Sequence, residues 1–170
     1  MQVYVALLRA VNVGGTGKLP MADLRAMAEA CGLDRPRTYI ASGNLLFRSA
    51  MAEAALRAAL EARLLAYAGK RVGVLVRSAA EIAAVAAANP FPDAPGNRVM
   101  AIFLHEPVTP ATLKGIVGQT ADEAVALGRR EIYVHYAAGQ GDSKLRIPAA
   151  RDGTARNLNT VTKLAELARA

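Results

Sequence analysis

The stretch Thr38-Tyr39-Ile40-Ala41-Ser42-Gly43-Asn44-Leu45-Leu46-Phe47 decides the fold, because two short β-prone runs flank a polar turn within it. Residues 38–40 and 45–47 are mostly apolar and bounded by turn-forming residues, as expected of strands. The intervening Ser42-Gly43-Asn44 is typical of a tight turn. The stretch therefore predicts a β-hairpin, and the elements on either side of it determine which sheet fold contains that hairpin.

The elements before the hairpin are a strand and a helix. Residues 3–9 are apolar almost throughout, which predicts a central strand buried on both faces. After a glycine-rich loop, Pro20 suits the first turn of a helix. Leu24, Met27, Ala28 and Cys31 then recur with the helical period, and Gly32 can end that helix.

A second helix and strand follow the hairpin. Residues 51–68 place Leu56, Leu60, Leu64 and Tyr67 on one face of a long amphipathic helix, and residues 72–76 read as a strand. The order strand, helix, strand, strand, helix, strand predicts a ferredoxin-like (split β-α-β) half over residues 1–77. In that fold two helices cover one face of a four-stranded antiparallel sheet.

The rest of the chain repeats this rhythm less completely. Residues 78–97 are interpreted as a linking helix, begun by a Ser78–Glu81 capping box, and a proline-rich linker. In residues 98–170 we expect strands at 99–104, 124–127 and 132–136, a short helix from Thr109-Pro110 to Gly118, and a C-terminal helix starting within 154–157. The chain is therefore predicted to be an α+β protein of two ferredoxin-like subdomains, the second incomplete, with antiparallel sheets covered by helices.

Charge and composition narrow the function classes. The 170 residues include 21 basic and 14 acidic side chains, a net charge of +7, and residues 1–48 and 139–170 each hold 6 basic and 3 acidic residues. A basic face would attract nucleic acid, nucleotides or phosphorylated metabolites, although GC-rich codon usage also produces an arginine excess. The single cysteine, Cys31, excludes an internal disulfide and a C-x-x-C pair. No membrane span or signal peptide is expected, which predicts a cytoplasmic protein.

Familiar catalytic motifs are absent. The segment Gly14-Gly15-Thr16-Gly17-Lys18 follows a strand, but Asn12 and Leu19 occupy positions where a Walker motif needs glycine and a hydroxyl, and Pro20 breaks the dinucleotide pattern. Two histidines on separate strands predict no metal site. No cofactor is expected either, and Phe47 alone gives no stacking platform for sequence-specific RNA recognition.

Four polar motifs carry a family resemblance. They are residues 5–15, residues 18–25, residues 37–44, and residues 143–145 together with 154–161. In this order they resemble the bacterial domain-of-unknown-function family 1697, which implies a pair of ferredoxin-like subdomains and no established activity. The chain departs from the family pattern at Ala10-Val11, where glycine-isoleucine is usual, and at Leu158, where tryptophan is usual. This chain thus keeps the polar residues of the family motifs better than it keeps the aromatic residue.

The matching polar residues define a candidate anion site. Strand ends, turns and helix starts leave backbone amides unpaired, and a helix start carries about half a positive charge that favours phosphate or carboxylate. The alternative is that Ser42-Gly43-Asn44 only forms a turn and that Asn157 or Thr154 only caps the last helix. The candidate residues are Arg9, Asn12, Gly14, Gly15, Lys18, Ser42, Gly43, Asn44, Ser143, Lys144, Arg156, Asn157, Asn159 and Thr160.

Three function classes stay open at this point. The favoured one is a module that binds a phosphorylated small molecule or nucleotide. The second is an enzyme that acts on such a ligand by positioning and electrostatic stabilisation, with Lys144 or Lys18 as the charged partner. The third is a nucleic-acid-backbone or protein-interaction module, whose binding would weaken steeply with salt.

Overall fold

The apolar run near the N-terminus forms the interior strand of the first sheet. In the computed structural model, which describes residues 1–12 and 18–169, this strand is β1 (Gln2–Leu8), and Tyr4 to Leu8 are buried. The sheet is antiparallel with strand order β2-β3-β1-β4, where β2 is Asp34–Thr38, β3 is Asn44–Ser49 and β4 is Val74–Ser78. The predicted hairpin and ferredoxin-like order are confirmed.

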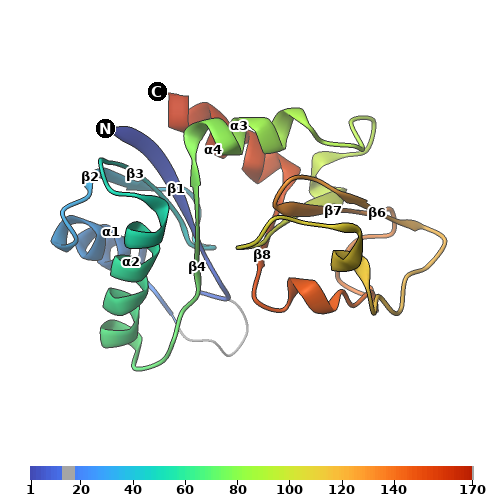
Figure 1. Cartoon of the computed structure of the whole chain (residues 1–170), viewed down its shortest axis with the longest axis horizontal. Helices are drawn as coiled ribbons and strands as arrows, with labels where there is room; N and C mark the ends of the chain where they lie inside the picture. The colour runs from blue at the N-terminus through green and yellow to red at the C-terminus, as the bar shows by residue number, and fades with distance from the viewer. Residues whose placement is uncertain (13–17, 170) are drawn as a thin grey trace. The chain divides into compact units, whose positions relative to one another are not determined.

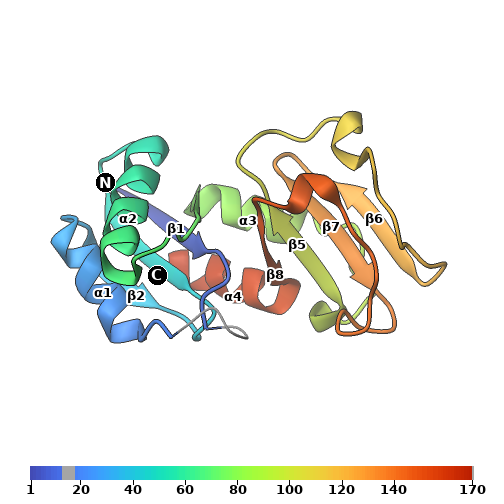
Figure 2. The same ribbon diagram turned by 90° about the horizontal axis from the view of Figure 1, so that it is seen from below.

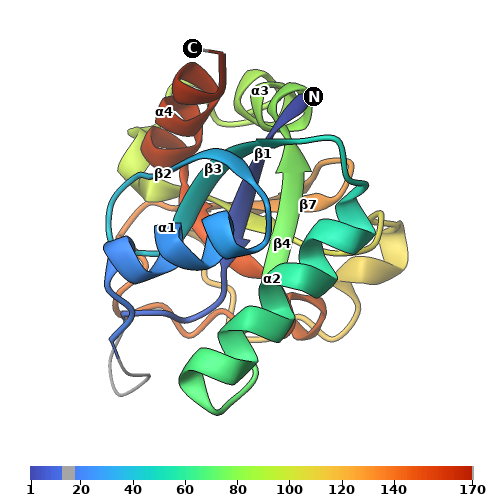
Figure 3. The ribbon, with the colours of Figure 1, turned by 90° about the vertical axis from the view of Figure 1, so that its left-hand side faces the viewer.

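Two helices cover one face of this sheet, α1 (Met21–Ala30) and α2 (Glu53–Ala68), as Figures 1 and 3 show. Leu24 of α1 and Leu56, Leu60 and Leu64 of α2 pack into one core with the strand side chains of that face. Tyr67 departs from the prediction that it shares this buried stripe, because it is 48% exposed. Its hydroxyl donates a hydrogen bond to the carboxylate of Asp23 at the surface, at 2.6 Å.

The edge strand β2 begins earlier than the sequence predicts. Asp34 pairs with Arg48, and Arg37 pairs with Leu46, so the register shifts between Asp34 and Arg37 and the strand contains a bulge. Pro36 has no N–H to donate, and proline is tolerated in a sheet only at an edge strand or a bulge. Both conditions hold here, so Pro36 lies inside the strand.

The second sheet repeats the order of the first. Its strands are β5 (Val99–Phe103), β6 (Glu123–Leu127), β7 (Glu131–Tyr136) and β8 (Thr154–Asn157), and they are antiparallel in the order β6-β7-β5-β8 (Figure 2). This is the order of the first sheet with each strand replaced by its counterpart. The prediction that residues 154–157 begin the last helix is wrong, because they pair with β5 and α4 (Leu158–Arg169) starts after them.

Short helical turns replace the two long helices in this second half. A 3-10 turn, η2 (Pro110–Leu113), lies between β5 and β6, and another, η3 (Pro148–Ala150), lies between β7 and β8. The helix expected to reach Gly118 stops at Leu113, and Val117 instead forms an isolated bridge with Arg146. The second half thus has short 3-10 turns in place of long covering helices, and its sheet has four strands rather than the three that the sequence predicts.

The chain divides into two compact units. The first unit is Met1–Ile82 with Glu166–Ala170, and the second is Ala83–Ala165. In sequence, the main segment of the first unit ends within helix α3 (Ala79–Ala87). This helix begins with the predicted Ser78–Glu81 capping box. The irregular proline-rich segment and a 3-10 turn, η1 (Gly96–Arg98), follow it. No helix among the described residues is long and apolar enough to cross a membrane.

Candidate functional site

The end of β1 collects the candidate residues of the first unit. The Leu8 amide donates to the Gly43 carbonyl at 2.9 Å, and the Arg9 amide donates to the Gly73 carbonyl at 2.8 Å. The hairpin turn and the approach to β4 therefore flank the end of β1. Gly43 has φ +90°, and a Cβ there would lie 2.6 Å from Val11 Cγ2, so only glycine fits this contact without movement.

The Asn12 side chain connects the loop that follows β1 to its neighbours. Its Nδ2 donates to the carbonyl of Leu19 at 2.9 Å and to that of Ala41 at 2.7 Å, and its Oδ1 accepts from the Leu19 amide at 2.7 Å. Asn12 has φ +56°, a conformation that asparagine tolerates better than most residues. This amide holds residues 12 and 19 close together across the glycine-rich segment.

The Asn44 side chain has a comparable role within the hairpin turn. It is fully buried, and its Nδ2 donates to the Tyr39 carbonyl at 2.9 Å and to Ser42 Oγ at 3.0 Å. These bonds close the turn between β2 and β3. Asn44 thus has the turn-forming role that was the alternative to ligand binding, and its amide is directed at the backbone.

Lys18 is a candidate residue that lines a cavity. The cavity has a volume of about 470 Å³, and its polar lining includes Lys18, Lys70 and Tyr67. Its apolar lining comes from the loop after β1, from α2 and from the segment between α2 and β4: Val11, Leu19, Leu64, Ala68 and Val72. The hydrogen bond to Asp23 raises the pKa of Tyr67 above its ordinary value.

Sequence reasoning missed Lys70 and Tyr67. Lys70 directly follows Gly69, which ends α2 in the left-handed conformation with φ +72°. In the sequence, Lys70 is recognisable only as a lysine just past the end of a predicted helix. That it lines the same cavity as Lys18 depends on how α2 packs against the sheet. Tyr67 was interpreted as a core residue.

In the second unit, Ser143 and Lys144 lie in the loop before η3. Ser143 Oγ donates a short hydrogen bond to Glu123 Oε2 and also accepts from the Leu145 amide at 3.2 Å. The bond from Ser143 is the main reason that the pKa of Glu123 is lowered, followed by the bond from the Thr120 amide. Lys144 is exposed, so the two neighbours have different surroundings.

The last motif lies on β8 and the first turn of α4. Arg156 is 7% exposed, and its Nη1 donates to Thr154 Oγ1 at 2.8 Å and to the Ala155 carbonyl at 2.9 Å. Burial lowers the pKa of Arg156 to about 10. Asn157 Oδ1 accepts from the Thr160 amide at 2.9 Å and so caps α4, which is again the alternative role. Asn159 is exposed and packs against Gly96.

The candidate residues are divided between the two units. Arg9, Asn12, Lys18 and residues 42–44 belong to the first unit, and residues 143, 144, 156, 157, 159 and 160 belong to the second. Gly14 and Gly15 lie outside the described residues. That all four motifs share one site stays a prediction. Within residues 1–12 and 18–169 no cluster of three or more His, Cys, Asp or Glu side chains is suited to a metal ion.

Two sheets with the same strand order, each with polar and basic residues at strand ends, define a tandem ferredoxin-like α+β protein. Residues 1–133 match the family described as "Protein of unknown function (DUF1697)", and the chain belongs to that family. The solved structure of the conserved bacterial protein SP0830 from Streptococcus pneumoniae is similar, with 25% sequence identity and a TM-score of 0.82 over 100% of this chain and 99% of that one. No protein with a curated description matches the chain.

Proposed function

We propose that this protein binds a phosphorylated small molecule or nucleotide in the cavity of the first unit that Lys18 and Lys70 line. The observation that carries the proposal is the cavity itself, about 470 Å³ in volume, with two lysines beside an apolar wall. Small-molecule sites commonly combine a mostly apolar concave surface with a few polar groups that fix orientation. We also propose a cytoplasmic location, where such ligands occur and where a single unpaired cysteine is ordinary.

Different side chains of this cavity would contact different parts of the ligand. The ammonium groups of Lys18 and Lys70 are compact positive charges suited to phosphate oxygens. Leu64 and Val72 would contact an apolar or planar portion of the ligand. The Tyr67 hydroxyl donates to Asp23, so its oxygen is left to accept a hydrogen bond from the ligand.

A thermal-shift screen of the full chain tests this proposal. The panel contains orthophosphate, sugar phosphates and nucleotides, together with short DNA and RNA. At about a hundredfold excess over its Kd, a ligand selective for the folded state adds about 2.7 kcal/mol of stability, which raises Tm by about 5 to 10 °C in a chain of this size. We expect such a rise with at least one phosphorylated small molecule.

Matched variants locate the binding. Lys18→Gln and Lys70→Gln each remove one positive charge from the cavity, and we expect either to reduce the rise. Lys114→Gln removes an exposed lysine of the second unit and is expected to leave the rise unchanged. A flat response to every phosphorylated small molecule, with strong stabilisation by DNA and RNA, would overturn the proposal and favour the nucleic-acid module.

A further inference from the structure

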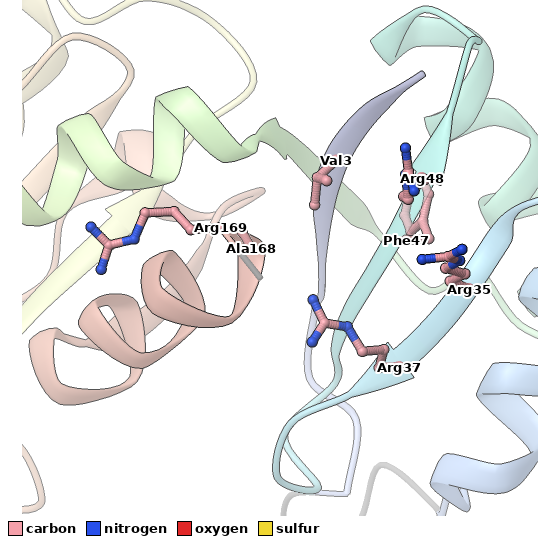
Figure 4. A pocket seen from close by; sticks show the side chains of 7 residues that line it. All are labelled: Val3, Arg35, Arg37, Phe47, Arg48, Ala168 and Arg169. Carbon is pink, nitrogen blue, oxygen red and sulfur yellow. The ribbon is translucent and has the colours of Figure 1, made fainter.

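A second cavity of the first unit has an unusually basic lining. It has a volume of about 440 Å³, and four of its lining residues are arginines: Arg35, Arg37, Arg48 and Arg169. No carboxylate contributes to its described lining. Figure 4 shows Arg35, Arg37 and Arg48 extending from the neighbouring strands β2 and β3, while the Arg169 side chain extends away from the other three. Arg35, Arg37 and Arg48 therefore form the basic cluster of this cavity.

The register of the sheet explains how two of these arginines share a face. Arg37 is the cross-strand partner of Leu46, and Arg48 lies two residues further along β3, so Arg37 and Arg48 project from the same face. Phe47, between Leu46 and Arg48, belongs to the core under α1 and α2. Strand alternation thus directs Arg37 and Arg48 to the face opposite these helices.

The bulge in β2 adds the third arginine. Arg35 lies in the interval where the register shifts, and its φ of +50° is in the left-handed region that disfavours side chains other than glycine. Bulges redirect side chains next to functional sites, and strained backbone concentrates at such sites. The positive φ of Arg35 therefore supports a functional cavity independently of the clustered charges.

The hydrogen bonding of the three arginines leaves donors for a ligand. Arg48 Nε is buried and has no hydrogen-bond partner among the described residues. Arg35 Nε lies 4.0 Å from Asp34 Oδ2, and both side chains are exposed to solvent. Arg37 donates through Nη2 to the Leu167 carbonyl, in the C-terminal segment of the same unit, at 2.5 Å. That bond orients the guanidinium of Arg37 and uses only one of its five N–H groups.

We propose that this cavity binds a small ligand that carries two or three linked phosphate groups, as a nucleoside di- or triphosphate does. Three guanidinium groups match phosphate oxygens in bidentate geometry and supply three positive charges. A single phosphate group has too few oxygens to engage three guanidinium groups in bidentate geometry, whereas two or three linked phosphate groups have enough. Val3 and Ala168 form an apolar part of the lining suited to the remainder of the ligand.

Isothermal titration calorimetry of the full chain with inorganic tripolyphosphate and with orthophosphate tests the proposal. We expect tripolyphosphate to bind at least about tenfold more tightly than orthophosphate. Losing one charge-assisted contact weakens binding by about tenfold or more. We therefore expect Arg48→Gln and Arg37→Gln each to weaken the binding of tripolyphosphate by at least about tenfold. Arg63→Gln, an exposed arginine on α2, is the matched control and should change the affinity less than about twofold.

Two further variants separate binding from folding. Arg35→Gly removes a guanidinium but relieves the positive-φ strain, so the variant should unfold no more easily than the wild type while it binds tripolyphosphate more weakly. Arg48→Lys keeps the charge but lacks the fork of donors, and its affinity should fall between those of the wild type and Arg48→Gln. Equal affinities in the wild type and in folded Arg35→Gly and Arg48→Gln would overturn the proposal.

The same titration distinguishes this site from the lysine-lined cavity. The double variant Lys18→Gln/Lys70→Gln leaves the three arginines unchanged and should bind tripolyphosphate with an affinity close to that of the wild type. If this double variant abolished the binding and the arginine variants did not, the second site would be refuted and the lysine-lined cavity supported. If Arg63→Gln weakened binding as much as Arg48→Gln, the attraction would be diffuse and the proposal would fail.

Discussion

Asn44 shows how a polar residue of a candidate site can also stabilise the fold. Its side chain is completely buried, and Nδ2 donates hydrogen bonds to a backbone carbonyl and to a neighbouring hydroxyl, both within the hairpin turn. The sequence pattern that suggested a ligand-binding turn is therefore also what a stable β2–β3 connection requires. Such a buried side-chain amide tolerates few substitutions, because removing it leaves its hydrogen-bond partners unsatisfied.

We expect Asn44→Ala to lower the free energy of unfolding by about 2 kcal/mol, because the Tyr39 carbonyl loses its donor inside the protein. Asn44→Asp should be destabilising as well, since a carboxylate cannot donate that bond. Urea unfolding followed by circular dichroism measures both changes. Ser42→Ala, which removes only the hydroxyl partner, is the control and should cost less. A loss below about 0.5 kcal/mol in Asn44→Ala would show that water replaces the amide.

Among the elements, α4 depends on a residue that also belongs to the family motif. Asn157 Oδ1 accepts from the amide of Thr160 in the first turn of the helix. Replacing a capping side chain with alanine typically costs about 1 kcal/mol, whereas aspartate caps about as well as asparagine. We therefore expect Asn157→Ala to lower the stability by about that amount and Asn157→Asp to restore it, as measured by urea unfolding. Failure of Asn157→Asp to rescue stability would mean that the Asn157 Nδ2 donor matters more than the cap.

The strand β7 carries a tyrosine whose burial makes the protein sensitive to alkali. Tyr133 is 2% exposed, and its hydroxyl donates to the Val85 carbonyl at 2.8 Å within the second unit. Burial, with a smaller contribution from Glu131, raises the pKa of Tyr133 from 10.0 to about 12. The unfolded chain therefore releases this proton at lower pH than the folded chain. The stabilisation is complete below about pH 10 and is lost as the pH rises toward 12.

Comparing wild type with Tyr133→Phe tests this linkage. Between about pH 9 and about pH 11 the tyrosine should cost the wild type about 1 kcal/mol of stability that the variant does not lose, at about 1.4 kcal/mol for each pKa unit. Urea midpoints at the two pH values give the difference directly. Tyr136, whose pKa burial also raises, is present in both proteins and so cancels in the comparison. Parallel losses in the two proteins would assign the alkaline sensitivity to other groups.

The sequence predicts best the elements in which a hydrophobic pattern extends over many residues. Leu56, Leu60 and Leu64 indicate α2 plainly, and the apolar run of β1 indicates an interior strand. The strand β8 was missed because four residues are too few to establish alternation, and because one of its two buried positions is Arg156, which a hydrophobic pattern does not place inside. Local pattern alone cannot reveal a buried cation that bonds its own strand.

At the scale of the whole molecule, the order of elements in the first sheet was predictable, but the fourth strand of the second sheet and the cavities were not. The order strand, helix, strand, strand, helix, strand gives the first sheet, and β5 to β8 repeat it with short turns in place of long helices. Lys70 was not predicted beside Lys18 because their proximity depends on how α2 packs. Arg35 and Arg37 are two residues apart in sequence, yet only the bulge and the pairing with β3 reveal their relation to Arg48.

The net charge of +7 belongs to the whole molecule, and it predicts a weak attraction to DNA that differs from binding in either cavity. Six to ten DNA phosphate contacts lose about 10³ to 10⁵ in affinity between about 50 and about 200 mM salt, because binding releases counterions condensed on the duplex, and a small ligand carries no such counterion layer. We expect DNA binding, measured by fluorescence anisotropy, to be detectable only at low salt and to weaken equally in Arg48→Gln and Arg63→Gln. DNA binding that persists at about 200 mM salt and depends on Arg48 would instead make the arginine-lined face a nucleic-acid surface.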